Sequence, residues 1–199
     1  MLKKTIRQLQ KEETRAKILE ISYEEFGKHG ILSTRMSDIA AAADVSHGTV
    51  FAHFETQESL IAAVIEQYGG KIALRTHELS NNCADIRDIL AAHLNSIMEF
   101  EPFYKRLVME MSFLPPTAQA VFISIQSAVS FHLSIAFEKE IATGTIIDTP
   151  IYLLFNTWIG LVNYYLANEN LFAPEGHVIR RYGDVLINHY MRLITVIKT

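Results

Sequence analysis

The sequence predicts an all-α protein of about nine helices, in which a small three-helix unit precedes a larger helical part. Apolar residues recur at helical spacing almost throughout the 199 residues. No run alternates with the two-residue period of a strand, and no Asn-Gly or Asp-Gly pair marks a hairpin. Of the 20 aromatic residues, 15 follow residue 80, so the two parts also differ in composition.

Glycine, proline and capping residues predict where each helix begins and ends. Gly30 follows the first helix, Ser46 caps the third, and Pro102, Pro150 and Pro174 each open a later one. The expected helices are 12–28, a short one from Thr34, 48–54, 57–79, 85–100, 102–113, 117–141, 150–167 and 174–197. Two domains are expected, 1–55 and 56–199, and residues 56–79 form the helix that links them.

Composition places the chain among ordinary globular proteins. Apolar residues make up 49% and charged residues 20%, which excludes a disordered or collagen-like chain. The 18 basic and 22 acidic residues give a net charge of −4, so a nucleic-acid surface has to be local. Six basic and two acidic residues among the first 17 supply one candidate.

The sequence also favours a cytoplasmic location. The single cysteine, Cys83, cannot form an intramolecular disulfide, which fits a reducing compartment. The basic N-terminus is not followed by the apolar core of a secretory signal. Polar residues and Gly160 interrupt the apolar stretch 151–166, so we expect no membrane span.

The stretch 34–54 has the pattern of two short helices joined by a tight turn. Residues 43–46, Ala-Asp-Val-Ser, form the turn, whose centre requires a left-handed backbone that Asp tolerates better than most residues. Val45 is expected to fill the angle between the helices. A shared core is expected from Ile39, Ala40, Ala43, Val50 and Phe54 with Leu19, Tyr23 and Phe26 of the first helix. The remaining face, His47 to His53, is small, polar and without acids, which suits a DNA major groove.

Residues 14–60 resemble the N-terminal domain of TetR-family transcriptional regulators. The resemblance rests on a threonine before the second helix, an Ile-Ala pair, a Val-Ser turn and a His-Phe pair in one register. The matching positions are Thr14, Ile18, Leu19, Phe26, Gly30, Thr34, Asp38, Ile39, Ala40, Ala43, Val45, Ser46, Gly48, Thr49, Val50, His53, Phe54 and Leu60. The resemblance implies a helix-turn-helix DNA-binding domain followed by a helical ligand-binding and dimerisation domain.

Four positions depart from the family pattern. Asp44 replaces the usual Gly, Phe51 the usual Tyr, Gln57 the usual Lys, and His47 a residue that is commonly basic. Phe51 cannot donate a hydrogen bond to phosphate and Gln57 carries no charge. These changes predict weaker phosphate binding, with a salt dependence reduced by roughly 0.9 for each phosphate that is no longer neutralised. The basic arm 3–11 is expected to compensate along the backbone or in the minor groove.

The resemblance assigns the DNA contacts to the two short helices. Thr49 and His47 are expected to contact bases, and Arg35 a phosphate or a guanine. Thr34 and Ser46 are helix caps first and phosphate contacts second. His53 is expected at phosphate, with a structural hydrogen bond as the alternative. The predicted DNA-binding set is Thr34, Arg35, Ser46, His47, Gly48, Thr49, Phe51 and His53.

The helix from Pro150 and the last helix carry apolar residues on more than one face. A helix of this kind must bury both faces, and we expect a second copy to cover one of them. The predicted homodimer interface includes Tyr152, Ile159, Val162, Tyr182, Leu186, Tyr190 and Leu193. Two-fold symmetry also suits a pseudo-palindromic operator in double-stranded DNA, with half-sites about 34–36 Å apart. The alternative is burial of both helices within one monomer.

The middle helices combine large adaptable side chains with a few polar groups, as small-molecule sites do. Because the resemblance implies an effector site, we expect an apolar or aromatic effector there. The candidates are His93, Phe100, Tyr104, Met111, Phe113, Phe122, Gln126, Phe155 and Trp158. The alternative for each is an ordinary core position.

Nothing in the sequence points to catalysis. It has no His-Glu-x-x-His pair, no Gly-x-Ser-x-Gly elbow and no glycine-rich phosphate loop, so we expect no metal, cofactor or catalytic residue. The favoured function is a homodimeric repressor in which a small molecule shifts the helix 57–79. The alternatives are a protein-interaction module with a degenerate helix-turn-helix and an all-helical enzyme.

Overall fold

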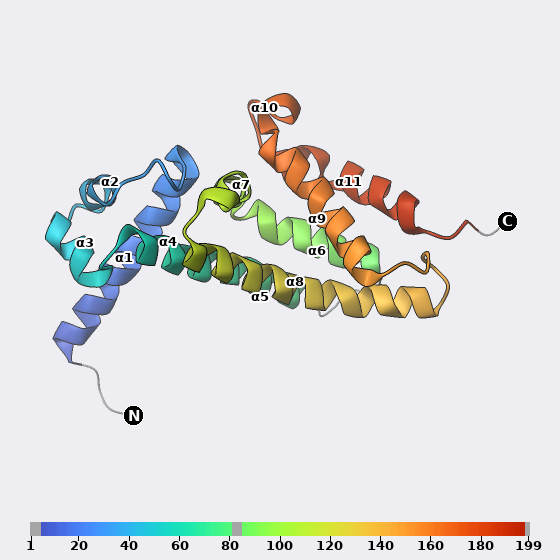
Figure 1. Cartoon of the computed structure of the whole chain (residues 1–199), viewed down its shortest axis with the longest axis horizontal. Coiled ribbons are helices and arrows are strands. Elements are labelled where there is room, and N and C mark those ends of the chain that lie inside the picture. The colour runs from blue at the N-terminus through green and yellow to red at the C-terminus, as the bar shows by residue number, and fades with distance from the viewer. Residues whose placement is uncertain (1–4, 81–84, 198–199) are drawn as a thin grey trace.

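The computed structural model describes residues 5–80 and 85–197, and all of its long elements are helices (Figure 1). The all-α prediction is confirmed. The helices are α1 (Ile6–His29), α2 (Met36–Ala42), α3 (His47–His53), α4 (Gln57–Val64), α5 (Gly70–Ser80), α6 (Ile86–Met98), α7 (Glu101–Glu110), α8 (Pro116–Ala142), α9 (Ile151–Ala167), α10 (Glu169–Phe172) and α11 (Val178–Ile194). A π-helical segment, Ile65–Gly69, joins α4 to α5, and a 3₁₀ turn, Met111–Phe113, follows α7.

Helix α1 starts at Ile6 rather than at Glu12, because Thr5 and Gln8 form a reciprocal cap. The Gln8 backbone N–H donates to Thr5 Oγ1 at 3.3 Å, and the Thr5 N–H donates to Gln8 Oε1 at 2.8 Å. The extra turns carry Arg7 and Lys11 on exposed positions. Lys3 and Lys4 of the predicted basic arm lie outside the described residues.

The turn between α2 and α3 has the predicted backbone. Asp44 has a φ of 52° and is the only non-glycine residue with positive φ in the described part of the chain. Ile39, Ala43 and Val50 are completely buried around the turn, and Val45 packs on them half-buried. The expected core of the three-helix unit is therefore present.

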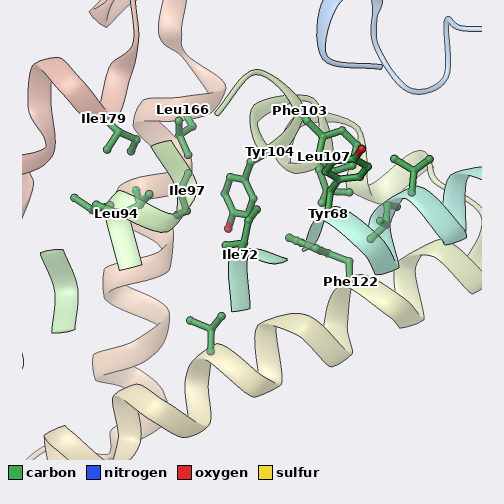
Figure 2. Close-up of a cluster of buried hydrophobic side chains, with 14 of the residues drawn as sticks. Tyr68, Ile72, Leu94, Ile97, Phe103, Tyr104, Leu107, Phe122, Leu166 and Ile179 are labelled. Atoms are coloured by element: carbon green, nitrogen blue, oxygen red, sulfur yellow. The ribbon is translucent and has the colours of Figure 1, made fainter. Parts of the chain in front are cut away.

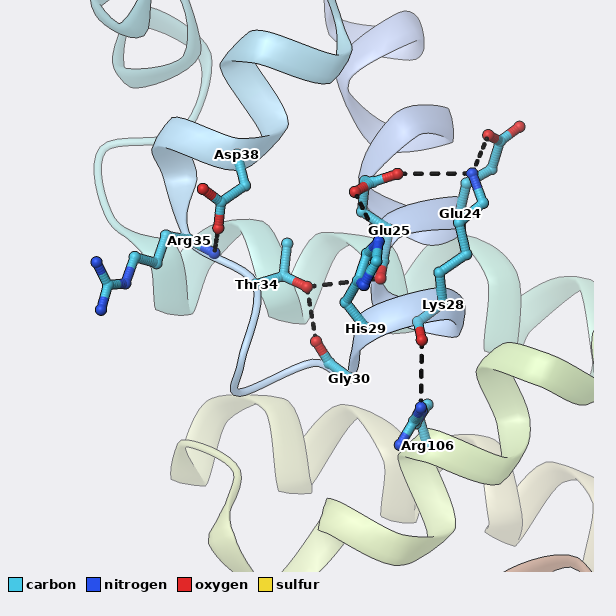
Figure 3. A network of polar contacts seen from close by, with 9 residues as sticks. All are labelled: Glu24, Glu25, Lys28, His29, Gly30, Thr34, Arg35, Asp38 and Arg106. Carbon is cyan, nitrogen blue, oxygen red and sulfur yellow. Dashed lines mark hydrogen bonds and ion pairs between the residues drawn. The ribbon is translucent and has the colours of Figure 1, made fainter. Parts of the chain in front are cut away.

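Thr34 does not cap α2, contrary to the expectation. Its hydroxyl donates to the Gly30 carbonyl at 2.7 Å, and the side chain is buried. The residue before α2 is Arg35, whose backbone N–H donates to Asp38 Oδ2 at 2.8 Å (Figure 3). An aspartate in the first helical turn thus accepts the N–H of the residue before α2, while the Thr34 hydroxyl is bonded to Gly30 and does not cap the helix.

The linking helix continues from Gln57 to Ser80 as expected, but its middle is the π-helical segment. Here the Tyr68 ring stacks on that of Tyr23 in α1, with centroids 4.0 Å apart and planes 11° apart. Phe103 of α7 packs on both rings. Gly69 lets α8 approach closely, because a Cβ there would lie 2.6 Å from Ile125 Cδ1 and would require that side chain to move. Figure 2 places Tyr68 beside Phe103 in the buried cluster.

The last helix starts at Val178, so the expectation that Pro174 opens it was wrong. A turn follows Pro174, with the Gly176 N–H donating to the Ala173 carbonyl at 3.1 Å. The buried carboxylate of Glu101 in α7 then accepts the Val178 N–H at 2.6 Å and the Ile179 N–H at 3.3 Å. An acidic residue from a distant helix therefore caps α11, where its charge also complements the helix dipole.

Helix α11 ends at Ile194, short of Ile197, because the chain after it pairs with the α8–α9 loop. The Ile147 N–H donates to the Ile194 carbonyl at 2.8 Å, and the Val196 N–H to the Thr145 carbonyl at 3.0 Å. This isolated antiparallel bridge is the only strand-like pairing among the described residues.

By length and composition, one described helix could cross a membrane. Helix α8 contains an 18-residue window of mean hydropathy 1.6, and 28% of that window is buried. Apolar helices of soluble proteins also reach this length and hydropathy.

The core of the larger part centres on Trp158 of α9. Its indole Nε1–H donates to Nδ1 of His93 in α6 at 3.1 Å, and both side chains are buried. Burial lowers the pKa of His93 to about 4, which keeps the imidazole neutral and able to accept this bond.

This shift predicts an acid sensitivity that His93→Gln should reduce. The folded-state pKa lies below the unfolded value of 6.5, so the stabilisation is present above pH 6.5 and is lost towards pH 4. The loss amounts to about 3 kcal/mol. Urea unfolding at pH 7 and pH 4.5 should show a smaller drop in the variant than in the wild type. The control is His29→Gln, at the exposed end of α1, whose free energy of unfolding should drop by as much as that of the wild type. Equal drops in all three proteins would contradict the prediction.

Candidate functional site

Helix α3 presents the predicted recognition face to solvent. Ser46 caps the helix by accepting the Thr49 N–H at 3.1 Å, and its hydroxyl lies 2.8 Å from Thr49 Oγ1. The exposed His47 ring contacts the Phe51 ring edge-on, at 4.8 Å between centroids. Gly48, between them, is exposed. The imidazole of His47 and the ring of Phe51 therefore lie on one side of a well-capped helix, and the half-buried Thr49 lies on another side.

Arg35 and Thr34 are neighbours with opposite placements. The Arg35 side chain is exposed and extends away from the helices in Figure 3, so it is free to reach a phosphate or a base. Thr34 is 2% exposed, with its hydroxyl held by the chain itself. The Thr34 side chain is therefore buried, contrary to the prediction that it contacts DNA.

His53 lies where α3 meets the basic side of α1. Its Nδ1 is buried and has no hydrogen-bond partner among the described residues. Burial, and then the charges of Lys11 and Arg15, lower the pKa of His53, so the ring is neutral at physiological pH. The Arg15 guanidinium lies 4.8 Å from the centre of the Phe54 ring. Lys11 and Arg15 thus place two positive charges beside the end of α3.

Gln57, which stands at a usual lysine position, has a structural contact. Its side-chain Nε2 donates to the Thr34 carbonyl at 3.0 Å, which ties the start of α4 to the segment before α2. The glutamine thus carries no surface charge and instead bonds the linking helix to the three-helix unit.

Helix α7 holds the three-helix unit through contacts that the sequence did not indicate. Glu110 accepts the Ile31 N–H at 3.2 Å and the Leu32 N–H at 2.7 Å, both in the α1–α2 loop. Arg106 Nη2 donates to the Lys28 carbonyl at 3.2 Å (Figure 3). These partners lie 78 or 79 residues apart in sequence, so no local pattern could have identified them.

Gly30 makes this approach possible. Its φ of 98° is unfavourable for other residues, and a Cβ would lie 2.9 Å from Glu110 Oε1. Glycine therefore both ends α1 and gives the carboxylate access to the loop.

Three of the seven predicted dimer residues belong to the core of the monomer. Val162, Leu186 and Tyr190 are buried, and Tyr190 Oη donates to the Leu154 carbonyl at 2.7 Å. The apolar pattern of these helices does not distinguish an inward face from one that meets a partner, which explains the error.

The other four predicted dimer residues have exposed surface. Tyr152 and Leu193 are 63% and 53% exposed, and Ile159 and Tyr182 are half-buried. Further exposed apolar side chains on α9 and α11 were not predicted, namely Leu153, Tyr164 and Val185.

Four predicted ligand residues line one open groove of about 550 Å³ between α8 and α9. They are Met111, Phe122, Gln126 and Phe155. Tyr104 lies behind the groove, where its Oη accepts a hydrogen bond from Gln126 Nε2 at 3.0 Å. Tyr152, predicted for the dimer interface, also lines the groove.

The remaining four predicted ligand residues lie elsewhere. His93 and Trp158 are bonded to each other in the core. Phe100 packs on the Tyr23–Tyr68 pair at the junction with α1. Phe113 is 78% exposed in the 3₁₀ turn after α7. Among the described residues, no three His, Cys, Asp or Glu side chains are grouped as a metal site requires, and Cys83 lies outside this part of the chain.

Residues 18–64, which hold α2, α3, the capped turn and Asp44, match the family model described as bacterial regulatory proteins, tetR family. The chain carries the TetR-family helix-turn-helix domain. A similar curated protein is the HTH-type transcriptional repressor Rv3405c of Mycobacterium tuberculosis (strain ATCC 25618 / H37Rv), which is 39% identical over 67 residues. The match covers 34% of this chain and 36% of that protein, so it spans about a third of the relative's length.

Solved structures extend the TetR-like fold over nearly the whole chain. FadR from Bacillus subtilis, in complex with stearoyl-CoA, has a TM-score of 0.75 at 15% identity, covering 88% of this chain and 97% of that one. A putative transcriptional regulator from Saccharomonospora viridis, in complex with choline, also has a TM-score of 0.75, at 17% identity, covering 94% and 100%. At such low identity these likenesses concern the fold alone.

The contacts of Glu110 predict that Glu110→Ala loosens the α1–α2 loop. The variant leaves two backbone N–H groups without their acceptor, which should lower the free energy of unfolding by about 1–3 kcal/mol. In the variant, amide hydrogen–deuterium exchange at Ile31 and Leu32 should become faster by a larger factor than exchange in the core of α9. Glu55→Ala, at an exposed loop position, serves as the control. Unchanged exchange at both amides would contradict the role assigned to Glu110.

Proposed function

We propose that this protein is a homodimeric DNA-binding transcriptional regulator, a repressor controlled by a small molecule. In this proposal residues 1–55 bind DNA and residues 56–199 bind the effector and dimerise. The observation that carries it is the exposed face of α3, which a capped turn presents beside the basic side of α1. The family match over residues 18–64 supports the same assignment.

The exposed chemistry of α3 suits direct readout in the major groove. Thr49 and His47 can hydrogen-bond to base edges, and the exposed Phe51 ring can contact a thymine methyl group. Arg35, and the N–H groups at the start of α3 around Ser46 and Gly48, suit phosphate oxygens. Lys11 and Arg15 add positive charge next to His53, which offsets the absence of a lysine at position 57.

The exposed apolar side chains of α9 and α11 support a homodimer. Such a dimer would place two recognition helices on the half-sites of a pseudo-palindromic operator. An effector in the larger domain could then act through two connections to the DNA-binding unit, the linking helix Gln57–Ser80 and the α7 contacts of Arg106 and Glu110. A differential affinity of about 1–3 kcal/mol between two states would change operator binding by about 5–150-fold.

A second candidate is a protein-interaction module with a degenerate helix-turn-helix. The exposed Phe51 ring against His47, together with the net charge of −4, favours it. The two candidates differ in whether the protein selects a DNA sequence.

Selection from a random duplex pool at two salt concentrations should enrich a pseudo-palindrome. On that site, Thr49→Ala should relax the preference at one symmetric pair of bases by about 1–3 kcal/mol. Arg35→Ala should reduce the slope of log affinity against log salt by about 0.9 for each phosphate that Arg35 neutralises. Lys139→Ala removes a positive charge from α8, far from α3, and should change neither quantity. Weak binding without an enriched sequence at either salt concentration would favour the interaction module.

The dimer proposal predicts that a charge on the outer faces of α11 produces monomers. Val185→Glu and Leu193→Glu should each shift the protein from dimer to monomer in sedimentation equilibrium, because a buried unpaired carboxylate is costly. Leu74→Glu on α5 is a matched control, since Leu74 and Val185 are each 57% exposed. Dimers that persist in both α11 variants would place the interface elsewhere.

A further inference from the structure

The groove between α8 and α9 has an apolar lining at both of its ends. Along α8 the lining residues follow two helical rows, Phe122–Gln126–Ser130 and Ile123–Ser127–Phe131. One end of the pair of rows is apolar, the middle is polar, and the other end carries Phe131 beside Ser130. The apolar lining consists of Met111, Phe122, Ile123, Phe131, Tyr152 and Phe155. A volume of about 550 Å³ lies within the range of small-molecule sites. This lining favours a ligand with an aromatic or other flat apolar body.

The middle of the groove offers uncharged hydrogen-bonding groups. Gln126 and Ser127 are the middle residues of the two α8 rows, and Ser130 and Asn156 also line the groove. The Gln126 amide donates to Tyr104 Oη, and because an amide has a carbonyl and two N–H bonds it retains capacity for a ligand. Burial raises the pKa of Tyr104 to about 12, so the hydroxyl behind the groove is also uncharged at physiological pH.

No Asp, Glu, Lys, Arg or His is among the described residues that line the groove. An anionic ligand would find no basic partner and would lose hydration without electrostatic compensation. A cationic ligand would find no carboxylate, and only the faces of aromatic rings would compensate for its lost hydration. This lining does not suit the charge of stearoyl-CoA, which a protein of similar fold binds.

We propose that this groove binds an uncharged aromatic molecule carrying one amide-like or hydroxyl-like group that hydrogen-bonds with Gln126. The inference rests on the proposed function, because it names the chemical class of the effector. It excludes the anionic fatty acyl thioesters of coenzyme A as ligands of the groove.

Three naphthalene derivatives of nearly the same shape test the charge requirement. The probes are 2-naphthamide, which is neutral, 2-naphthoate, an anion, and 2-naphthylmethylammonium, a cation. Isothermal titration of the full-length protein at pH 7.5 should give an affinity for 2-naphthamide at least about tenfold higher than for either ion. Tighter binding of either ion, or no binding of any probe up to millimolar concentration, would overturn the proposal.

Two variants locate the binding. Gln126→Leu keeps the size of the side chain and should weaken 2-naphthamide binding by about three- to tenfold. Asn95→Leu makes a similar change in the separate crevice between α6 and α11 and should leave the affinity unchanged. A loss in Asn95→Leu with none in Gln126→Leu would place the probe outside the groove and overturn the assignment.

Sedimentation with and without probe distinguishes a small molecule from a second copy of the chain as the occupant. An unchanged oligomeric state supports the proposal, whereas dissociation by 2-naphthamide would mean that a partner copy fills the groove. DNA selection separates the two proposals. An enriched operator with no preference for the neutral probe would defeat only the effector class. Selective 2-naphthamide binding without an enriched operator would defeat only the regulator.

Discussion

Helix α7 connects the α1–α2 loop to the start of α11 through one carboxylate at each end of the helix. Glu101 accepts two N–H groups at the start of α11, and Glu110 accepts two in the α1–α2 loop. Glu101 satisfies two buried backbone donors, whereas Glu110 satisfies the partly buried Ile31 N–H and the exposed Leu32 N–H. Loss of the acceptor is therefore most costly at the buried groups, which water does not reach. A ten-residue helix thereby fixes the position of the recognition unit relative to the last helix of the larger domain.

Aromatic packing supports the same junction. Tyr23 of α1, Tyr68 of the π-helical segment, and Phe100 and Phe103 beside or within α7 form one cluster. Rings that pack in this way resist sliding, because any displacement separates a ring from several neighbours at once. The hydrogen bonds of α7 set the orientation, and the aromatic cluster gives the junction its rigidity.

The local features of the DNA-binding unit were predictable because nearby residues determine them. A left-handed turn at Asp44, a serine cap at Ser46 and an apolar core at helical spacing follow from residues close in sequence. The placement of Thr34 was not predictable, because α2 begins one residue later than expected and the Thr34 hydroxyl donates to the Gly30 carbonyl. In the larger domain, helix positions were mostly anticipated, but the start of α11 was missed because its capping group, Glu101, lies 77 residues away. Periodicity could not separate core residues such as Tyr190 from outward ones such as Leu193, since both positions are apolar.

The π-helical segment has a consequence for the length of the linking helix. The linking helix buries Ile61, Ile65 and Gly69 at steps of four residues, then Ile72 after three residues and Thr76 after four. In an α-helix a step of four residues overshoots one full turn by about 40°, so such a row winds around the helix axis. The wider π turn absorbs part of this overshoot and keeps the row in phase with α8 and α6. We therefore expect the linking helix to tolerate an inserted or deleted residue less well than most changes of its side chains.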